Sequence, residues 1–438
     1  MSTGNITVTQ GACLLLSTLL GSGVLIIPAL AASTSGIYSL AAWVLIILAM
    51  LPIVVTFAAL GKRFPHEGGT AYYVKQAFGD NAAKAIGILY IAIAPIGPPV
   101  VFIAGASYFA QFLGNSSLDA IYFELGMLLL IFIANCLKIE TSAKLQTYIS
   151  FGLIITILAI CFLAILEPTS VSSTTMNAVA NTAANNVNST VNSTAANMAN
   201  FSLVDIGKSV AIMFWCFVGI EAICHIAKDF NDPARDFPKV VVIGVAVAAL
   251  IYVVVSYSVI KLGAYGSELQ NLQSITTVAS ISAGVWGAKI VALVGFLGCF
   301  CGVNVYVISF AKMLYSMGDK TSNLKRKLGN GTPIVAVSII TVAIAAMLFA
   351  RASLSFSFEV LLDYANGMFV FIYLAAAAAG IKLLTGKIRY AAIFSLLFCL
   401  AILWFIGVST LFGLSIVLGS FCLFRFRDRV EPVEYDVS

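Results

Sequence analysis

The sequence predicts an all-α membrane protein with about twelve transmembrane helices, arranged as two inverted five-helix repeats whose first members are broken. Three observations lead to this fold class. The chain of 438 residues is 61% hydrophobic and only 10% charged, with a mean hydropathy of +1.02, whereas an ordinary soluble domain carries about 25% charge. Its apolar runs have the length of membrane-spanning helices, and two of them are interrupted at corresponding places. Residues 1–438 are therefore expected to form one transmembrane domain in a lipid bilayer.

A membrane-spanning helix needs roughly 20 predominantly apolar residues. Runs of this kind lie at 8–31, 39–61, 84–112, 121–138, 145–166, 205–226, 239–262, 285–316, 333–350, 358–381, 388–406 and 408–424. The last two are short and are also compatible with one hairpin. Helices are expected because the runs lack the two-residue alternation of barrel strands.

The runs divide into a first five-helix repeat at 8–166 and a second at 205–381. The last two helices, at 388–424, lie outside both repeats. Because five is odd, the second repeat enters the membrane from the opposite side. Between the spans at 39–61 and 84–112, residues 62–84 mix charged and aromatic side chains, which predicts a short amphipathic helix at the cytoplasmic surface.

Residues 168–202 are rich in Asn, Ser, Thr and Ala and carry no charge. This composition predicts a flexible loop outside the membrane, between the two repeats. It contains glycosylation sequons at Asn188, Asn192 and Asn200, and another begins at Asn115. Low-complexity sequence of this kind produces sequons by chance, so glycosylation stays open.

The distribution of Lys and Arg predicts which side of the membrane each loop faces. With a cytoplasmic N-terminus, all but four of the 24 Lys and Arg residues fall on the inside, the exceptions being Lys208, Lys261, Lys289 and Arg351. This bias predicts cytoplasmic N- and C-termini in a multi-pass protein of the cell membrane. Residues before the first span carry no Lys or Arg, so no cleavable signal peptide is expected. The net charge of +5 is thus a topology signal and does not indicate a nucleic-acid partner.

All nine cysteines lie inside or at the edge of apolar runs, where they fill space between helices. Cys299 and Cys301 are too close together for a zinc pair on one helix, and no ligand spacing with His is present. The sequence therefore predicts no metal site, no disulfide and no cofactor.

The first span is interrupted at Gly21-Ser22-Gly23, and the sixth span contains Gly219 ahead of Glu221. Taken alone, Gly-Ser-Gly is also typical of a helix-packing patch. The second break at the corresponding place in the other repeat favours a substrate site near the membrane midplane.

Broken helices leave backbone groups that need partners in hydrocarbon. The amides at the start of the half-helix after the first break can hold a carboxylate, and the carbonyls that end the half-helix before the second break can hold an ammonium group. Together they match a zwitterionic α-amino acid. The predicted binding residues are Gly21, Ser22, Gly23, Val24, Phe214, Trp215, Cys216, Phe217, Val218 and Gly219. Among them the aromatic residues favour recognition of an apolar side chain.

At these residues the sequence resembles the APC (amino acid–polyamine–organocation) superfamily. Residues 21–28 (GSGVLIIP) are similar to its first-helix motif, 64–79 to its FPxxGGxYxYxxxAFG loop, 213–238 to its sixth helix and following loop, and 304–319 to its eighth-helix pattern. Residues 213–222, with Tyr364-Ala365-Asn366-Gly367, are most similar to the bacterial L-methionine and branched-chain amino acid exporter group. The likeness spans nearly all of the chain except 168–202.

The resemblance implies a LeuT-type fold that works by alternating access, with Phe214, Trp215 or Phe217 as an aromatic wall or gate of the site. It also implies that Asp229 and Lys312 act in cytoplasmic gating, although the family usually has Glu and Arg there. Many relatives carry a lysine midway along the fifth helix, in place of a bound sodium ion. The aligned residue here is Leu153, which leaves the coupling ion open.

Three further polar residues are predicted to lie within the membrane, where ionisable groups are functional candidates. Glu221 and His225 are four residues apart and share a helix face. They form either a proton-linked pair or a structural brace for the broken helix. Asn304 on the eighth helix is expected to face the first break, as a candidate coupling residue.

These patterns predict a secondary active transporter of neutral apolar L-amino acids (methionine, leucine, isoleucine and valine) that works as an exporter, with a proton favoured over sodium as the coupling ion. An importer or exchanger, and a polyamine or cationic amino acid transporter of the same fold, are alternatives. An amino acid sensor is the alternative outside transport. No catalytic dyad, nucleophile elbow or P-loop is visible, so an enzyme is not expected.

Overall fold

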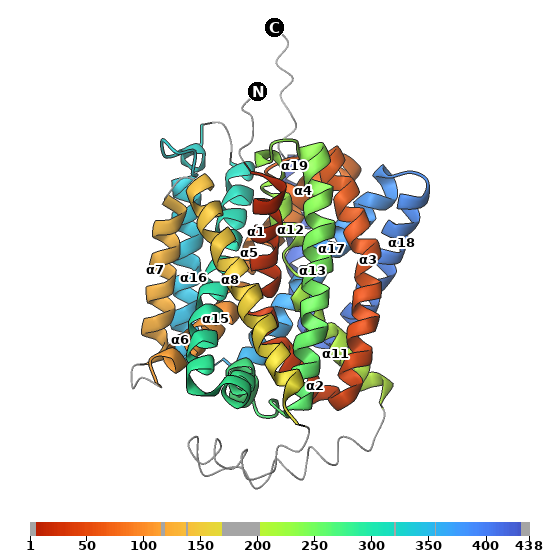
Figure 1. Ribbon diagram of the computed structural model, residues 1–438. Coiled ribbons are helices and arrows are strands. Elements are labelled where there is room, and N and C mark those ends of the chain that lie inside the picture. The colour runs from red at the N-terminus through yellow and green to blue at the C-terminus, as the bar shows by residue number, and fades with distance from the viewer. Residues whose placement is uncertain are drawn as a thin grey trace.

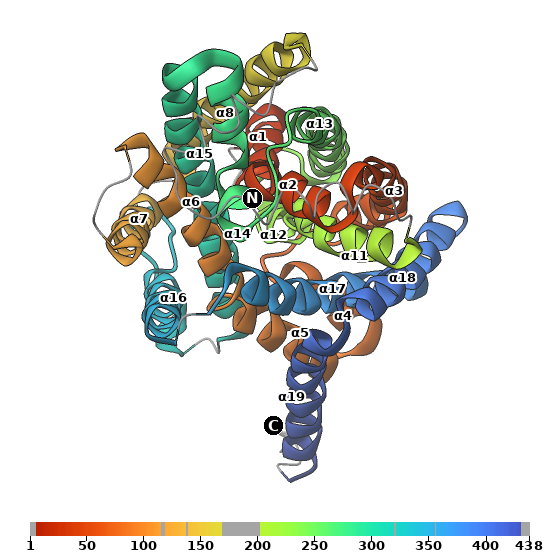
Figure 2. The ribbon, with the colours of Figure 1, turned by 90° about the horizontal axis from the view of Figure 1, so that it is seen from below.

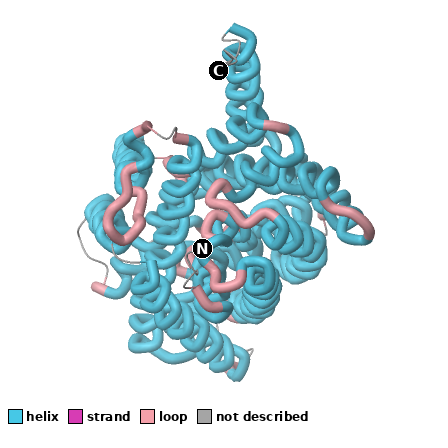
Figure 3. The backbone as a smooth tube through the Cα atoms, turned by 90° about the horizontal axis from the view of Figure 1, so that it is seen from above, coloured by secondary structure: helices cyan, strands magenta, loops and turns pink. Residues whose placement is uncertain are grey.

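The computed structural model describes residues 6–114, 119–136, 139–168, 202–318, 321–354 and 356–430. Within these ranges the regular structure is helical, with short connecting loops (Figure 3) and one isolated parallel bridge between Ile6 and Phe230. The loop predicted at 168–202 lies, apart from its two end residues, outside the described residues. The asparagines of the four sequons also lie outside them.

The first repeat begins with two helices in place of one. Its helices are α1 (Val8–Leu20), α2 (Gly23–Ser35), α3 (Ser39–Arg63), α4 (Gly69–Phe78), α5 (Asp80–Ile93), α6 (Gly97–Phe112), α7 (Ala120–Cys136) and α8 (Ile139–Leu166), with a 3₁₀ turn η1 (Gly36–Tyr38) after α2. The helix expected within 62–84 is α4. Its buried face includes Tyr73 and Val74 and packs against α5 and α17.

The second part of the chain begins with a helix that is interrupted by a 3₁₀ turn. Its elements are α11 (Leu203–Met213), η3 (Phe214–Phe217), α12 (Ile220–Cys224), η4 (Ala227–Asp229), α13 (Pro233–Lys261), α14 (Glu268–Leu272), α15 (Ser274–Met317), η5 (Asn323–Lys325), α16 (Ile334–Leu354), α17 (Phe358–Leu383), α18 (Lys387–Ile406), η6 (Gly407–Ser409) and α19 (Thr410–Val430). Gly284 interrupts α15 with a φ of 67°, and the expected eighth span begins directly after it.

The protein is an integral membrane protein. In the part of the chain that the structure describes, 9 helical stretches are long and apolar enough to cross a membrane, and Ala120–Cys136 is a shorter apolar helix. Val8–Arg63 contains α1 to α3, and Lys387–Phe426 contains α18 and α19. Trp404 of α18 is 83% exposed, as expected of a side chain that faces lipid. The count of about twelve spans stays a prediction.

Counterpart helices of the two expected repeats lie side by side around the centre. The pairs are α3 with α13, α6 with α15, and α7 with α16. Such pairing is what a twofold axis between two inverted repeats produces. The exact boundaries of the repeats remain predictions.

The two broken elements lie in the middle of the bundle, whereas α19 stands out from it and packs on α5 and α17 (Figure 2). The two ends of the described chain lie at one end of the bundle, here called the terminal face (top of Figure 1). The helix α1 runs inward from this face and α2 continues to the opposite face. The helix α11 runs inward from that opposite face and α12 continues toward the terminal face.

Candidate substrate site between two broken helices

The first break is a change of backbone direction over two residues. The Gly21 amide still donates to the Ser17 carbonyl (3.1 Å) and ends α1. Ser22 then precedes α2, and the Leu25 amide donates to the Ser22 carbonyl (3.2 Å). The amides of Gly23 and Val24 open α2 and have no preceding helical turn to donate to. They form the positive end of a half-helix inside the bundle.

Close packing with α15 explains the glycine at the start of the first break. A Cβ at Gly21 would lie 3.4 Å from the Gly298 carbonyl oxygen, and a Cβ at Gly302 would lie 2.8 Å from the Ser17 carbonyl oxygen. The two backbones thus touch, and side chains would force them apart.

The second break is longer. After Met213 the chain tightens into η3, becomes extended at Val218 (φ −70°, ψ 123°) and turns at Gly219, whose φ of 142° favours glycine. The Val218 amide donates to the Trp215 carbonyl (3.2 Å). The carbonyls of Cys216 and Phe217 therefore end the half-helix and form its negative end.

Two tyrosine hydroxyls hold these carbonyls in place. Tyr252 of α13 donates to the Cys216 carbonyl (3.2 Å) and also to the Leu19 carbonyl of α1, so it ties the two breaks together. Tyr373 of α17 donates to the Phe217 carbonyl (2.7 Å). Each carbonyl keeps a second lone pair, with which it can accept a hydrogen bond from an ammonium group.

A cavity of about 10 Å³ lies where the breaks meet. It has room for about one water molecule. Its lining comes from both breaks and from α6 and α15, namely Thr18, Gly21, Ser22, Val101, Trp215, Val218, Gly302 and Tyr306. Of the predicted binding residues, Gly21, Ser22, Trp215 and Val218 line it. An amino acid therefore needs this space to widen.

Trp215 is the aromatic residue that closes this cavity. Its indole nitrogen donates to the Ser22 hydroxyl (3.1 Å), which joins the two breaks across the cavity. Its ring packs edge-on against Phe369 of α17 (6.1 Å between centroids). Phe214 and Phe217 pack instead on Tyr373 and Tyr252 respectively. Trp215 is thus the gate candidate among the three predicted aromatic residues.

Glu221 is fully buried and satisfied by three donors. Its carboxylate accepts from the Gly219 amide (2.9 Å), the Tyr306 hydroxyl (3.0 Å) and the Tyr373 hydroxyl (2.6 Å). The carboxylate therefore connects the second break to α15 and α17, one turn from the small cavity.

His225 follows α12 and has separate partners. Its Nδ1 lies 2.7 Å from the Glu67 carbonyl oxygen, and its ring stacks on Tyr90 at 4.6 Å. Within the described chain, its buried Nε2 has no hydrogen-bond partner. Glu221 and His225 thus point to different neighbours, which favours the structural role for His225.

Asn304 lies against α7. Its side-chain oxygen accepts from Asn135 (2.7 Å), whereas Gly298 and Gly302 of α15 lie against the backbone of the first break. Leu153 is 1% exposed and lies next to Gly298. An apolar side chain therefore occupies the space between α8 and α15 beside the first break.

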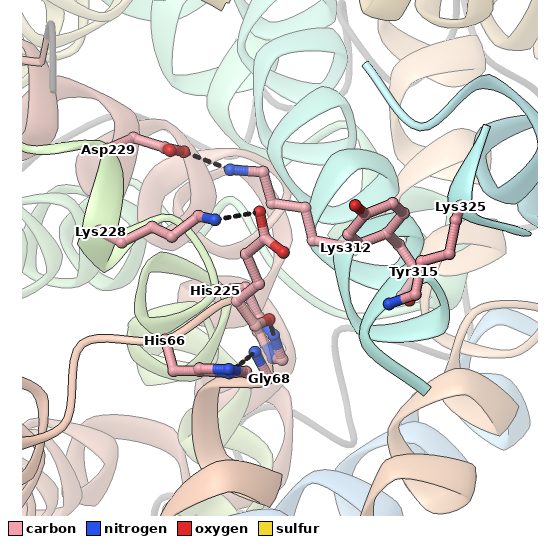
Figure 4. A network of polar contacts seen from close by, with 9 residues as sticks. His66, Gly68, His225, Lys228, Asp229, Lys312, Tyr315 and Lys325 are labelled. Carbon is pink, nitrogen blue, oxygen red and sulfur yellow. Dashed lines mark hydrogen bonds and ion pairs between the residues drawn. The ribbon is translucent and has the colours of Figure 1, made fainter. Parts of the chain in front are cut away.

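Two ion pairs lie at the terminal face (Figure 4). Lys312 of α15 pairs with Asp229 of η4, and Lys228 pairs with Glu67 on the loop before α4. Burial acts to raise the pKa of Glu67, but the hydrogen bond and positive charge of Lys228 outweigh it, and the pKa falls below its ordinary value of 4.5. The Glu67 carboxylate is thus charged throughout the neutral range. The two ion pairs together link η4, α15 and the loop before α4.

These pairs border a second, larger cavity of about 260 Å³, here called the vestibule. Leu14 of α1, Asn304 and Ile308 of α15, and Ile226 after α12 line it together with the charged residues. In the described ranges, no group of three or more His, Cys, Asp or Glu residues could hold a metal ion.

Comparison with known proteins decides the family. The sequence profile of the amino acid permease family matches residues 6–426. The chain belongs to this family. It is 31% identical to the L-methionine/branched-chain amino acid exporter YjeH of Escherichia coli, over 96% of each chain.

More distant relatives differ in the transport that their names describe. The permease is 23% identical to the serine/threonine exchanger SteT of Bacillus subtilis, over 93% of this chain and 92% of that one. It is 22% identical to a cadaverine/lysine antiporter of Escherichia coli, over 66% of this chain and 61% of that one. Family and relatives are transporters and not enzymes.

The permease has the LeuT-type fold. A solved Na⁺-coupled sialic acid symporter, in a substrate-bound outward-open state, superposes with a TM-score of 0.57, over 95% of this chain and 91% of that one, at 12% identity. At this identity the likeness shows the fold alone.

Several residues around the site were not identified from the sequence. Thr18 and Gly302 line the small cavity, and Tyr252, Tyr306 and Tyr373 hold the backbone or Glu221. A tyrosine within an apolar run is a signal that could have been used, because its buried hydroxyl needs a partner.

Proposed function

We propose that this permease is a secondary active transporter that exports neutral apolar L-amino acids, with methionine, leucine, isoleucine and valine as substrates, by alternating access. The observation that carries the proposal is the pair of facing half-helix ends. Free amides begin at Gly23, and the carbonyls of Cys216 and Phe217 lie beside them. A Cβ at Gly23 would lie 3.6 Å from Cys216 Cα, so the two ends are in contact range of one small ligand.

These ends recognise a head group without a charged side chain. A carboxylate is favoured at the N-terminal end of α2 and an ammonium group at the C-terminal end of η3. The side chain of the amino acid would then take the space that Trp215 and Val101 line. An apolar lining favours methionine and branched-chain residues over polyamines and cationic amino acids, which need an acidic pocket. Glu221 does not supply one, because its oxygens already bind three donors.

The small volume of the cavity at the breaks implies that side chains or helices move during transport. Because about 10 Å³ cannot hold an amino acid, Trp215 and α1 are the elements that give way when substrate enters. The exporter YjeH, at 31% identity over nearly the whole chain, supports export over import or exchange. The Lys and Arg bias supports a cytoplasmic terminal face in the cell membrane, with both termini inside.

We propose a proton as the coupling ion in preference to sodium. Sodium binding beside the first break needs several oxygen ligands, but the apolar side chain of Leu153 packs against Gly298 there. Glu221 is the buried carboxylate nearest to the breaks and links them to α15 and α17.

The direct test is transport by the purified protein in liposomes. Labelled leucine or methionine is expected to show saturable flux, stimulated by unlabelled substrate on the other side and by a pH gradient but not by sodium. Saturable binding without flux would favour the sensor alternative, and flux of a polyamine alone would favour the cationic one.

A further inference from the structure

The vestibule has the chemistry of a second amino acid site, distinct from the small cavity at the breaks. Its volume of about 260 Å³ is large enough for a small amino acid. Apolar side chains of Leu14, Val305 and Ile308 form one part of its lining, and amides and charged groups form another. A zwitterion with an apolar side chain needs both kinds of surface.

The charge of the vestibule favours a carboxylate. Five charged residues line it, three lysines and two acids. Glu67 is paired with Lys228, and Asp229 is paired with Lys312. Lys327 forms no ion pair with any described residue, and its ammonium lies 4.4 Å from the centre of the Tyr315 ring. The vestibule therefore carries an excess of one positive charge at Lys327.

The vestibule lies directly on the path to the small cavity. On α1, Leu14 lines the vestibule and Thr18 lines the small cavity, about 6 Å apart along a helix axis. On α15, Gly302 lines the small cavity and Ile308 lines the vestibule, about 9 Å further along the helix axis. At the second break, Val218 lines the small cavity and Ile226 lines the vestibule. The two cavities are thus successive positions for one ligand.

We propose that the vestibule is a loading site, where a neutral amino acid binds by its carboxylate to Lys327 and by its side chain to Leu14 and Ile308, before the way to the breaks opens. The inference rests on the proposed function, since it concerns the same substrates on the same path. Such a site raises the local substrate concentration on the side from which export begins.

The chain offers a matched control for Lys327. The ammonium of Lys325 lies 4.3 Å from the centre of the same Tyr315 ring, but Lys325 does not line the vestibule. Figure 4 shows the Lys325 side chain. Both lysines carry the same charge on the same loop. An effect of general surface charge would appear in both variants, whereas an effect of the loading site would appear only at Lys327.

The experiment measures leucine transport in membrane vesicles of both orientations. Lys327→Gln is expected to raise KM about two- to five-fold when leucine is added on the vestibule side, in line with one exposed ion pair. The maximal rate, and KM from the opposite side, are expected to stay at wild-type values. Lys327→Arg is expected to keep wild-type KM, and so is Lys325→Gln.

Three results would overturn the proposal. They are an unchanged KM in Lys327→Gln, an equal rise in Lys325→Gln, and a rise that vanishes in liposomes of phosphatidylcholine alone, which would assign Lys327 to anionic lipid. Wild-type protein that moves no amino acid would refute the proposed function itself, so the two failures are distinguishable.

Discussion

Replacement of Gly23 tests the contact between the two half-helix ends. A Cβ at this position would lie 2.7 Å from the Tyr252 hydroxyl oxygen and 3.5 Å from the Cys216 sulfur. Valine adds two further methyl groups in the same crowded space. Overpacking of this kind costs about 1–3 kcal/mol, and we expect a comparable cost to binding, because the added methyl groups would lie between the ends that hold the head group.

The expected effect on affinity follows from that cost. At 1.4 kcal/mol for each factor of ten, Gly23→Val should raise the leucine Kd by about 5- to 150-fold, and Gly23→Ala should raise it less. Equilibrium binding of labelled leucine to the purified variants measures both. Gly126→Val is the matched control, because a Cβ at Gly126 meets no atom within 4 Å.

The variants must insert and fold, which size-exclusion chromatography checks. A graded loss from alanine to valine supports the assignment even where the valine variant expresses poorly. Wild-type Kd in a correctly folded Gly23→Val protein would refute the reasoning.

Three further predictions follow from the residues around the breaks. Glu221→Gln keeps an acceptor for the Gly219 amide and should fold normally but lose stimulation by a pH gradient. A proton-stimulated Glu221→Gln protein would contradict the coupling proposal. Glu221→Ala leaves the Gly219 amide and the Tyr306 hydroxyl unpaired, whereas Tyr373 keeps the Phe217 carbonyl, and it should lower the melting temperature sharply, at about 1–3 kcal/mol for each unpaired donor. Trp215→Phe removes the hydrogen bond to Ser22, which is present without substrate. Because this bond has to break when Trp215 gives way to substrate, its loss should tighten leucine binding about 2- to 12-fold, from about 0.5–1.5 kcal/mol for one bond. Unchanged affinity would show that Trp215 is not part of the gate. Burial holds the pKa of His66 below its ordinary 6.5, so its Nδ1 accepts the hydrogen bond from the Gly68 amide (2.9 Å) at and above pH 6.5. The bond should be lost only as pH falls through the lowered pKa of His66. A hydrogen-exchange protection factor of Gly68 that stays constant into the acid range would contradict this.

The fold class could be predicted from the sequence because hydropathy and small residues in broken spans are strong signals. The interruptions at Gly21–Gly23 and near Gly219 both lie where the structure leaves regular helix. Asp229 and Lys312, which the family resemblance singled out, form an ion pair at the terminal face.

The direction of side chains after Met213 could not be predicted. A regular α-helix turns about 100° at each residue, but η3 is a 3₁₀ turn with three residues per turn. This change sends Trp215 into the small cavity and packs Phe214 and Phe217 on tyrosines. The orientation of Asn304 toward Asn135 could not be predicted either. Because α15 is apolar on most sides, its sequence pattern does not indicate which side faces α7.

The central claim is that backbone ends at the two breaks recognise both charges of an α-amino acid. Competition against labelled methionine, bound to the purified protein, tests this claim most directly. L-leucine should compete, whereas leucine methyl ester, which lacks the carboxylate, and 4-methylpentanoate, which lacks the amino group, should not. Effective competition by either analogue would contradict the account.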